Sequence, residues 1–330
     1  MTDKAIQWGI IGCGDVTEVK SGPAFSKVPG SKLVAVMRRD AAKAADYAQR
    51  HGVPAWYDDA ALLLADPAVN AIYVATPPST HAHYTNLAID AGKPVYVEKP
   101  MALDAGQAEE MTDYALEKNV PLVVAHYRRA QPLYLEIKQL LDAGAIGRPA
   151  VINLRLHKPQ RTHSSNTSVP WRLDPAISGG GLFHDLAPHQ LDIIYWLFGK
   201  ATQVSGFALN HSGTTDADDL VTAQMMLEKD IIFNGEWNFT NTIMPNIDRC
   251  EIIGDKGSIS FSFFDHQPIE LSRNGKIDQL HFEKLPHVQE PMIAKVVNYF
   301  LGKGENPCTG ADGMYVMQLI DEITLKKTSL

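Results

Sequence analysis

The first 125 residues alternate short apolar runs with segments of helical spacing, and this alternation restricts the fold more than any other feature of the chain. Strands are predicted at residues 6–11, 32–37, 71–75, 95–98 and 122–125, and helices at 41–50, 58–65, 80–91 and 105–118. The segment 15–27 is expected to begin with helix. Repeated strand–helix–strand units form right-handed crossovers, so the pattern predicts a parallel, doubly wound sheet. Ligands bind such sheets outside the carboxyl ends of the strands.

The pattern changes after residue 125. Predicted helices at 132–143 and from about residue 185 to 198 precede a succession of short strands between residues 201 and 281, and two helices close the chain at 291–301 and 311–326. Short strands separated by turn signals are typical of an antiparallel sheet. We therefore predict an α/β protein of two domains: residues 1–125 for binding a dinucleotide, and residues 126–330 as an α+β domain for substrate binding and oligomerisation.

A glycine turn marks the expected nucleotide site. Gly12-Cys13-Gly14 follows the first strand directly and opens a helix, which is the context that a dinucleotide fingerprint requires. The glycines permit close approach of the backbone to a pyrophosphate at the helix N-terminus, with Gly12, Gly14, Asp15 and Val16 as expected contacts. Thr17 stands at the third glycine position, which serves helix–strand packing, so the departure weakens the match without removing the site. A purely structural turn is the alternative.

The residues after the second strand indicate which coenzyme is bound. NAD sites usually place a carboxylate there for the ribose 2′-hydroxyl, whereas arginine accommodates a 2′-phosphate. Here the strand runs into Arg38-Arg39-Asp40, so Arg38 stands at the usual carboxylate position, with Arg39 beside it. Asp40 precedes an Ala-rich helix and is better suited to cap it. The sequence predicts NADP, with NAD possible.

A lysine is expected at the same sheet edge. Val95-Tyr96-Val97 has the composition of a buried parallel strand, and Glu98-Lys99-Pro100 follows it. Proline fixes its own φ and disfavours helix in the residue before it, so Lys99 takes an extended or turn geometry. A surface lysine that merely ends a strand is the alternative. In the catalytic interpretation, its charge stabilises a developing alkoxide.

Asp185 and His189 are the expected proton-handling groups. They lie four residues apart at the start of a predicted helix, after Gly179-Gly180-Gly181, so both side chains face the same way. Histidine has an unperturbed pKa near 6.5, which suits proton exchange at neutral pH. A helix cap and a core histidine are the alternatives. Together with His184 and Asp192 the pair could also bind a metal, but the lysine chemistry needs none, and we predict no metal.

In their order along the chain, these motifs resemble the Gfo/Idh/MocA oxidoreductase family. The resemblance covers nearly the whole chain and rests on Gly12-Cys13-Gly14, Ala75-Thr76-Pro77-Pro78 with His81, Ala91-Gly92-Lys93-Pro94, Glu98-Lys99-Pro100, Tyr127-Arg128-Arg129, Ile146-Gly147-Arg148-Pro149, Trp171-Arg172, and the three glycines followed by Asp185 and His189. It implies an N-terminal Rossmann domain and a C-terminal α+β domain with a large, mostly antiparallel sheet.

The resemblance also implies roles for individual residues. Lys99 would touch both the nicotinamide region and the reacting hydroxyl, and its bond to Pro100 is one that the family often keeps cis. His189 would be the general acid/base, and Asp185 would contact substrate or orient that base. The remaining implied cofactor contacts are Thr76, Pro77, His81, Glu98, Arg128, Trp171 and Arg172, and the implied substrate contacts are Lys99, Tyr127, Arg129, Asp185 and His189.

These residues predict an NADP(H)-dependent oxidoreductase that acts on a secondary alcohol or carbonyl of a sugar, sugar derivative or cyclic polyol. The polar loop from Pro159 to Pro170 is expected to help set specificity. Two alternatives remain: an NAD-dependent glycoside hydrolase that works by transient oxidation, as in some relatives of the family, and a regulator that binds nucleotide without catalysis. The presence of Lys99, Asp185 and His189 argues against the regulator.

Composition excludes several other classes. A formal charge of −8 argues against non-specific nucleic-acid binding, and no apolar run approaches the roughly 18 residues of a membrane span. Three scattered cysteines and a polar N-terminus without a signal peptide fit a cytoplasmic enzyme. We also predict a homodimer or homotetramer. Helices 185–198, 291–301 and 311–326 would cover one face of the C-terminal sheet, and Ile231, Phe233, Trp237 and Phe239 are expected among apolar residues on the open face.

Overall fold

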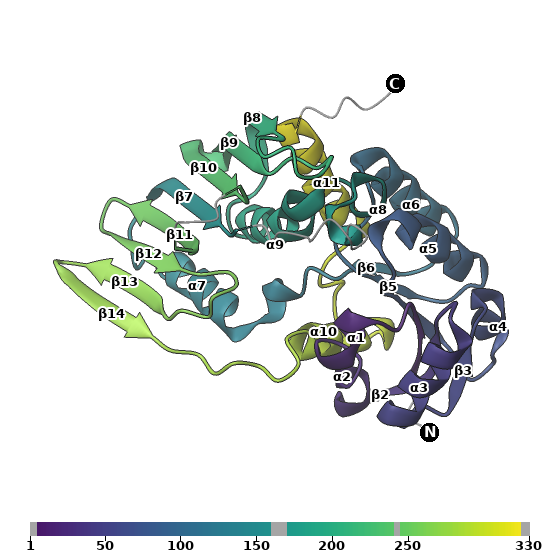
Figure 1. Ribbon diagram of the computed structural model, residues 1–330. Coiled ribbons are helices and arrows are strands. Elements are labelled where there is room, and N and C mark those ends of the chain that lie inside the picture. The colour runs from purple at the N-terminus through teal and green to yellow at the C-terminus, as the bar shows by residue number, and fades with distance from the viewer. Residues whose placement is uncertain (1–4, 160–169, 241–244, 325–330) are drawn as a thin grey trace. The chain divides into compact units, whose positions relative to one another are not determined.

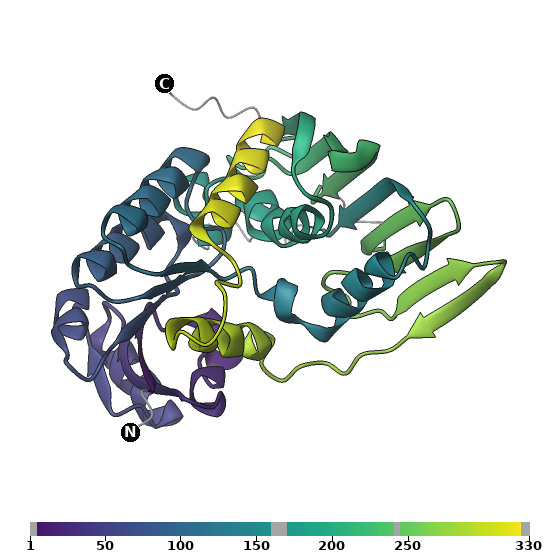
Figure 2. The same ribbon diagram turned by 180° about the vertical axis from the view of Figure 1, so that it is seen from behind.

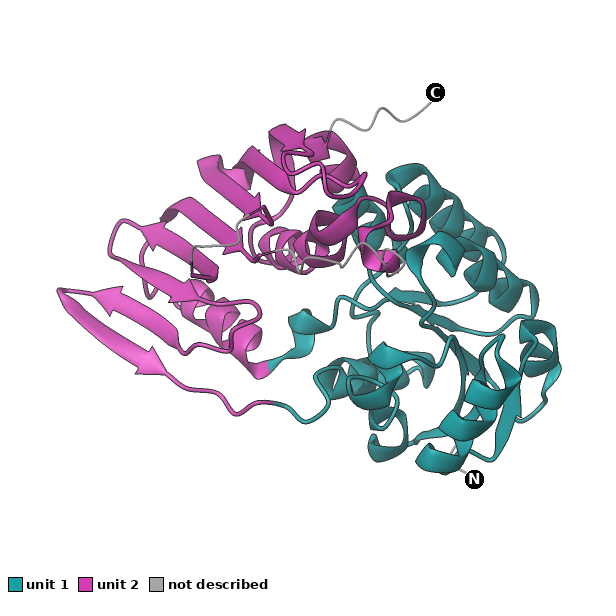
Figure 3. Ribbon diagram, in the orientation of Figure 1, with its two compact units in different colours: residues 1–131, 285–317 teal, residues 132–284, 318–330 magenta. Residues whose placement is uncertain are grey.

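The computed structural model describes residues 5–159, 170–240 and 245–324, and the chain divides into two compact units (Figure 3). The first unit comprises residues 1–131 and 285–317, and the second comprises residues 132–284 and 318–330. The predicted division at residue 125 therefore lies close to the first crossing point. The return of residues 285–317 to the first unit was not predicted, and it gives that unit a helix from far along the sequence.

Within the described residues, the first unit contains a six-stranded parallel sheet in the order β3-β2-β1-β4-β5-β6 (Figure 1). Its elements are β1 (Ile6–Ile11), α1 (Asp15–Val19), α2 (Ala24–Lys27), β2 (Ser31–Met37), α3 (Ala41–His51), β3 (Ala55–Tyr57), α4 (Ala60–Ala65), β4 (Ala71–Val74), α5 (His81–Asp90), β5 (Val95–Val97), α6 (Ala105–Glu117), β6 (Leu122–Val124) and α10 (Glu290–Phe300), with short 3₁₀ turns at Pro78–Thr80 and Tyr127–Ala130. The strand order reverses between β1 and β4, and this reversal is where a doubly wound sheet binds its ligand.

Local sequence explains these elements. Strands β4, β5 and β6 are buried at every position, as expected for parallel strands covered on both faces. Asp40 and Asp104 cap α3 and α6 by accepting hydrogen bonds from the backbone N–H groups of Lys43 and Gln107. The expected capping role of Asp40 is therefore confirmed.

Residues 15–27 begin with helix, as expected, and Gly22 and Pro23 separate α1 from the second short helix, α2; a Cβ at Gly22 would lie 2.2 Å from the carbonyl oxygen of Thr17. One feature of this unit differs from the sequence prediction. Helix α10 was expected to cover the C-terminal sheet. It packs in the first unit instead, where the Phe300 ring lies 5.6 Å from the ring of Trp8.

The second unit contains an eight-stranded sheet, counted within the described residues, in the order β14-β13-β12-β11-β7-β10-β9-β8. All neighbouring strands are antiparallel except β7 and β10. Its elements are α7 (Pro132–Asp142), β7 (Pro149–His157), α8 (Pro175–Ser178), α9 (Gly181–Phe198), β8 (Ala201–Leu209), β9 (Leu220–Leu227), β10 (Ile231–Asn238), β11 (Ile247–Gly254), β12 (Gly257–Phe261), β13 (Ile269–Arg273) and β14 (Lys276–Leu280), with 3₁₀ turns at Trp171–Leu173 and Glu228–Asp230. Helix α11 (Gly310–Thr324) begins in the first unit and ends in this one.

Helices cover one face of this sheet (Figure 2). The indole N–H of Trp237 on β10 donates to Gln190 on α9 at 2.7 Å, and a Cβ at Gly206 on β8 would meet the Ile323 carbonyl of α11 at 2.5 Å. On α7, the Tyr134 ring lies 6.1 Å from that of Phe261 on β12. These contacts identify the covered face and leave the other face without helices in the described part of this unit.

The expectation for the open face is wrong in its residues. Ile231, Phe233, Trp237 and Phe239 are all at most 3% exposed, because they lie on the face that the helices cover. The neighbouring positions of β10, namely Ile232, Asn234, Glu236 and Asn238, point to the opposite face. The alternation was real, but the sequence alone did not show which half of it faced the helices. Among the described helices, none is long and apolar enough to cross a membrane.

Candidate functional site

The glycine turn leaves β1 at the point where the strand order reverses. Gly12 has a φ of +95°, and a Cβ on it would come within 2.6 Å of the Thr76 side chain and 2.8 Å of the Thr76 backbone nitrogen. Only glycine fits between these two loops without displacing one of them. The predicted contacts Gly12 and Thr76 are therefore neighbours at the carboxyl edge of the sheet.

Thr17 explains the missing third glycine. Its buried hydroxyl accepts a hydrogen bond from the Gly14 N–H at 3.0 Å and donates to the Gly14 carbonyl at 2.8 Å. These two hydrogen bonds of the Thr17 side chain hold the glycine turn in its conformation. Asp15, which is exposed, and Val16, which is half-buried, open α1, a helix of only five residues. We infer that the turn itself, more than a helix dipole, shapes this site.

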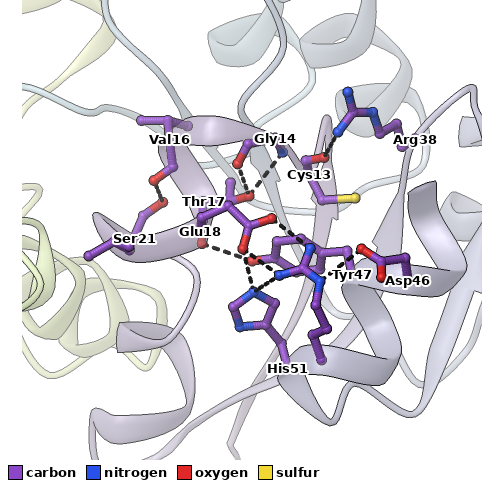
Figure 4. Close-up of polar contacts among 12 residues, drawn as sticks. Cys13, Gly14, Val16, Thr17, Glu18, Ser21, Arg38, Asp46, Tyr47 and His51 are labelled. Carbon is purple, nitrogen blue, oxygen red and sulfur yellow. Dashed lines mark hydrogen bonds and ion pairs between the residues drawn. The ribbon is translucent and has the colours of Figure 1, made fainter.

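Arg38 lies over the same turn, as Figure 4 shows. Its Nη1 donates to the Cys13 carbonyl at 3.1 Å, and the side chain is half-buried at the end of β2. Arg39 is exposed. The hydrogen bond that Asp40 accepts from the Lys43 backbone lowers the pKa of Asp40, in keeping with its capping role. A guanidinium rather than a carboxylate thus stands beside the glycine turn.

A charged cluster ties α1 to α3 behind the turn (Figure 4). The Glu18 carboxylate accepts two hydrogen bonds from Arg50, each at 2.8 Å, and a third contact at 2.8 Å joins it to His51. Its pKa falls to about 2, mainly because of the bonds from Arg50. Arg50 also bonds Asp46 at 2.8 Å. The cluster fixes the short helix that follows the glycine turn.

Lys99 follows β5 at the carboxyl edge and is half-buried. The Lys99–Pro100 peptide bond is cis, as the family resemblance implied. Glu98 is 5% exposed, and one of its oxygens accepts the backbone N–H of Lys99 at 3.1 Å. The other accepts from the Tyr73 hydroxyl and the Gln289 amide. The Glu98 carboxylate is thus engaged within the first unit; its contact with a cofactor stays a prediction.

His81 connects the loops that follow β4 and β5. Its Nε2 lies 2.7 Å from the Thr76 carbonyl oxygen and its Nδ1 lies 2.9 Å from that of Pro100. The ring is 1% exposed, and burial lowers its pKa. His81 thus holds Thr76 and the Lys99–Pro100 segment in place, and its predicted contact with the cofactor is untested. Pro77 lies directly after Thr76 in the first of these loops and is half-buried.

The Tyr127-Arg128-Arg129 motif is largely buried in the first unit, with exposed fractions of 6%, 9% and 7%. The Arg128 guanidinium lies over the Tyr127 ring at 5.6 Å. Arg129 pairs with Asp312 of α11 at 3.4 Å. Asp312 also accepts from Thr309, so Arg129 contributes to the start of that helix. These contacts give Arg129 a structural role beside its predicted substrate contact.

In the second unit, the structure brings three predicted residues together. Arg172 lies 3.6 Å from the Asp185 carboxylate, and its guanidinium stacks 4.4 Å from the centre of the Trp171 ring. Asp185 is on α9, whereas Trp171 and Arg172 form a 3₁₀ turn before α8. From sequence, only the family resemblance placed these three residues in one site.

His189 lies one turn further along α9 and is 6% exposed. Its ring contacts that of Phe264 edge-on at 5.9 Å, and Lys158 lies 4.6 Å above the Phe264 ring. Neither neighbour was predicted, because both follow strands distant in sequence. Helix α9 starts at Gly181, earlier than the predicted start near residue 185, so Pro188 lies inside the helix. A Cβ at Gly180 would lie 2.2 Å from the His184 ring, which accounts for one of the three glycines.

The predicted residues thus fall into two groups, one in each unit. Gly12, Gly14, Arg38, Thr76 and Lys99 share the carboxyl edge of the parallel sheet, and Trp171, Arg172, Asp185 and His189 share the region around α9. The loop at residues 160–169 lies outside the described residues. Within the described ranges, no group of three or more His, Cys, Asp or Glu side chains could hold a metal ion.

The edge of the parallel sheet suits a dinucleotide. A Cβ at Gly14 would meet only the Gly12 carbonyl oxygen, at 3.9 Å, so space above the turn is open to a pyrophosphate. The hydroxyl oxygen of Thr76 is buried and has no hydrogen-bond partner among the described residues, which leaves it available to a ligand. These two observations favour a bound group at this edge.

Comparison with known proteins identifies both parts of the chain. Residues 6–126 match the Gfo/Idh/MocA oxidoreductase family with an NAD-binding Rossmann fold, and residues 134–260 match the Gfo/Idh/MocA C-terminal domain. Oxidoreductase P35 of Formosa agariphila is 43% identical over 320 residues, which cover 97% of this chain and 98% of that protein. The scyllo-inositol 2-dehydrogenase (NAD(+)) of Bacillus subtilis is 29% identical over 273 residues, covering 81% and 76%.

Solved structures share the fold. Levoglucosan dehydrogenase in complex with NADH and L-sorbose has a TM-score of 0.85 at 21% identity, covering 96% of this chain and 95% of that one. The aldose-aldose oxidoreductase from Caulobacter crescentus, complexed with glycerol, also has a TM-score of 0.85, at 22% identity, covering 97% and 96%. At these identities the likeness concerns the fold, and it extends over both units.

Proposed function

Because the chain belongs to the Gfo/Idh/MocA oxidoreductase family, we propose that it is an NADP(H)-dependent enzyme acting on a sugar, sugar derivative or cyclic polyol. The reaction would transfer hydride between the nicotinamide and a secondary alcohol or carbonyl. The observation that carries this proposal is the position of Lys99 after β5, on the edge where the glycine turn follows β1. Relatives named as inositol and levoglucosan dehydrogenases support the substrate class.

The bound coenzyme supplies the hydride acceptor or donor, and the protein manages position and protons. In the proposed mechanism, the Lys99 ammonium stabilises negative charge on the reacting oxygen. His189 exchanges the proton, and Asp185 contacts the substrate or orients His189. Arg172 lies 3.6 Å from the Asp185 carboxylate and helps to orient it as an acceptor of substrate hydroxyls.

Selectivity for NADP(H) rests on Arg38. Its guanidinium is held beside the glycine turn by the Cys13 carbonyl, where a 2′-phosphate would be neutralised and an unmodified ribose would find no matching acceptor. Asp40, the nearby carboxylate, is occupied with capping α3. The test is a fluorescence titration of the protein with NADPH and NADH; tighter binding of NADH would contradict the proposal.

The open face of the second sheet supports self-association. The strand register aligns Gln224, Asn234, Asn153 and Glu251 in one row, in which amide hydrogen bonds of 3.0 and 3.1 Å join the first three. The row on one side of it is polar and charged and holds Thr222, Glu236, Arg155 and Arg249. The row on the other side is apolar and holds Met226, Ile232, Val151 and Ile253.

This face also contains a groove of about 630 Å³ and carries both signs of charge beside an apolar row. A second copy of the chain, turned by a two-fold axis, could therefore match it with unlike charges and apolar contacts. We propose a homodimer or homotetramer that uses this face. Light scattering at micromolar concentration tests it, and a mass of 36.3 kDa would refute it.

The activity itself is tested by a screen of sugars and polyols with NADP⁺ and NAD⁺, following nicotinamide absorbance. Substrate-dependent formation of reduced coenzyme in solution supports the proposal. Bond cleavage without release of reduced coenzyme would instead favour a glycoside hydrolase. Cytoplasmic location is a further proposal, supported by Cys13, Cys250 and Cys308, which are all buried thiols.

A further inference from the structure

The carboxylate of Glu98 is held inside the first unit by three donors. One oxygen accepts hydrogen bonds from the Tyr73 hydroxyl and the Gln289 amide, and the other accepts the Lys99 backbone N–H at 3.1 Å. Glu98 is 5% exposed, so water cannot readily replace a lost donor. A change in the hydrogen bonds of this carboxylate would therefore affect the backbone at Lys99, which donates one of them.

Gln289 reaches Glu98 from far along the chain. It immediately precedes α10, in the segment that returns to the first unit, and its side chain is completely buried. Its backbone N–H donates to the Lys20 carbonyl at 3.2 Å. Its amide oxygen accepts from the Tyr96 hydroxyl at 3.1 Å, so the amide NH₂ must face Glu98. The orientation of this amide is thus fixed from both ends.

The backbone on the other side of Lys99 is also held. The Pro100 carbonyl oxygen lies 2.9 Å from Nδ1 of the buried His81. We propose that Gln289 is a positioning residue for Lys99, which acts by holding the Glu98 carboxylate oriented against the Lys99 N–H. This inference rests on the proposed hydride-transfer function, in which Lys99 acts on the reacting oxygen.

The titratable groups around Glu98 show why the amide matters. Burial and the Glu98 charge raise the pKa of Tyr73 and Tyr96 well above the usual value, so both hydroxyls remain protonated. Burial lowers the pKa of His81. Loss of the Gln289 amide would leave that Glu98 oxygen with the Tyr73 hydroxyl alone of the two donors described above, so the carboxylate would be held less firmly. A carboxylate that can turn holds the Lys99 N–H less firmly, and the backbone position of Lys99 is then less fixed.

The experiment compares Gln289→Met with Gln131→Met, a matched change of another amide. Gln131 donates to the Val288 carbonyl at 3.0 Å and does not contact Glu98 in the structure. We expect Gln289→Met to lower kcat about 10- to 100-fold, with coenzyme Kd changed less than about threefold. The loss should therefore fall on kcat and not on coenzyme binding, as expected when Lys99 is displaced from the reacting oxygen. Gln131→Met should keep the wild-type kcat.

A second readout does not depend on activity. Hydrogen exchange at the Lys99 amide should become faster in Gln289→Met and stay unchanged in Gln131→Met. If Gln289→Met does not fold, Tyr73→Phe, which removes another donor to Glu98, must show the same two effects. Wild-type exchange and a wild-type kcat in the variant that folds would overturn the proposal. If the wild-type enzyme transfers no hydride, the proposed function fails, and the exchange measurement still decides the positioning role.

Discussion

The two sheets of this protein use their surfaces in opposite ways. In the parallel sheet, β4, β5 and β6 are buried at every position, so side chains on both faces are committed to packing. In the second sheet, β9 and β10 alternate between buried and accessible positions. In the first unit, accessible side chains are therefore found in the loops at the strand ends, whereas the second unit keeps accessible positions along one whole face of its sheet.

Connectivity accounts for the difference. Parallel strands need crossover helices, which cover both faces of the sheet. Antiparallel strands are joined by short turns, so helices are needed on only one face. Which surfaces of each sheet remain accessible therefore follows from how its strands are connected.

The largest effects are expected at Lys99, on the edge of the parallel sheet, and at His189, on α9 of the second unit. Lys99→Ala and His189→Ala should each lower turnover by roughly two to four orders of magnitude, because each removes charge stabilisation or proton transfer. Coenzyme affinity should fall more for Lys99→Ala, since Lys99 lies in the unit with the glycine turn. Steady-state kinetics measure both effects. Lys32→Ala, at an exposed position on β2, is the control, and equal activity of Lys99→Ala and this control would rule out the assigned role.

The two faces of the second sheet can be compared with one type of substitution. Phe233→Ala removes a ring that is 0% exposed and should reduce the free energy of unfolding by about 3–5 kcal/mol. Phe207→Ala removes a ring that is 70% exposed and should change the free energy of unfolding by less than about 1 kcal/mol in dilute protein. The same substitution should weaken self-association. Urea unfolding and light scattering measure these effects. Similar losses of stability would mean that the two faces do not differ in burial.

A smaller effect is expected on coenzyme choice. Arg38→Asp should reverse the preference for NADPH over NADH, with a change of about 10- to 100-fold in the ratio of the two Kd values, because the substitution removes a ligand for the 2′-phosphate and supplies an acceptor for the ribose hydroxyls. Arg39→Asp makes the same charge change at an exposed neighbour and should have less effect. Fluorescence titration gives the ratios. Identical ratios in wild type and Arg38→Asp would refute the assignment.

The smallest effect concerns the charged cluster behind the glycine turn. Arg50 lowers the pKa of Glu18 from 4.5 to about 2, so Glu18 binds protons less readily in the folded state than in the unfolded state. Its stabilising contribution is full above pH 4.5 and disappears as the pH falls through about 2. Glu18→Gln should therefore lower Tm at pH 7 and less so at pH 3. A difference in Tm that grows on acidification would contradict this sign.

The sequence predicted the parallel sheet well because its signals are local. The turn at Gly12, the cap at Asp40 and the strand before Lys99 each lie within a few residues of the element they define. Long-range contacts carry no such signal. Gln289 lies 191 residues from Glu98, and Phe264 reaches His189 from a loop after β12, so neither was predicted.

The open face shows a second limit. Alternation of apolar and polar residues in β10 predicts two faces, but a shift by one residue exchanges them. Phe233 and Trp237 were expected on the open face because the positions of the helices were not known from sequence. The position of α10 in the first unit was not predicted for the same reason, because an amphipathic pattern does not show which surface a helix covers.

A crystal structure of the protein with NADP⁺ would show directly where the coenzyme binds. We expect the pyrophosphate on the turn from Gly12 to Gly14, the 2′-phosphate at Arg38 and the nicotinamide beside Lys99, all at the carboxyl edge of the parallel sheet. Two results would contradict this expectation. One is coenzyme bound on the open face of the eight-stranded sheet. The other is coenzyme bound at the parallel sheet with its 2′-phosphate away from Arg38 and its nicotinamide away from Lys99.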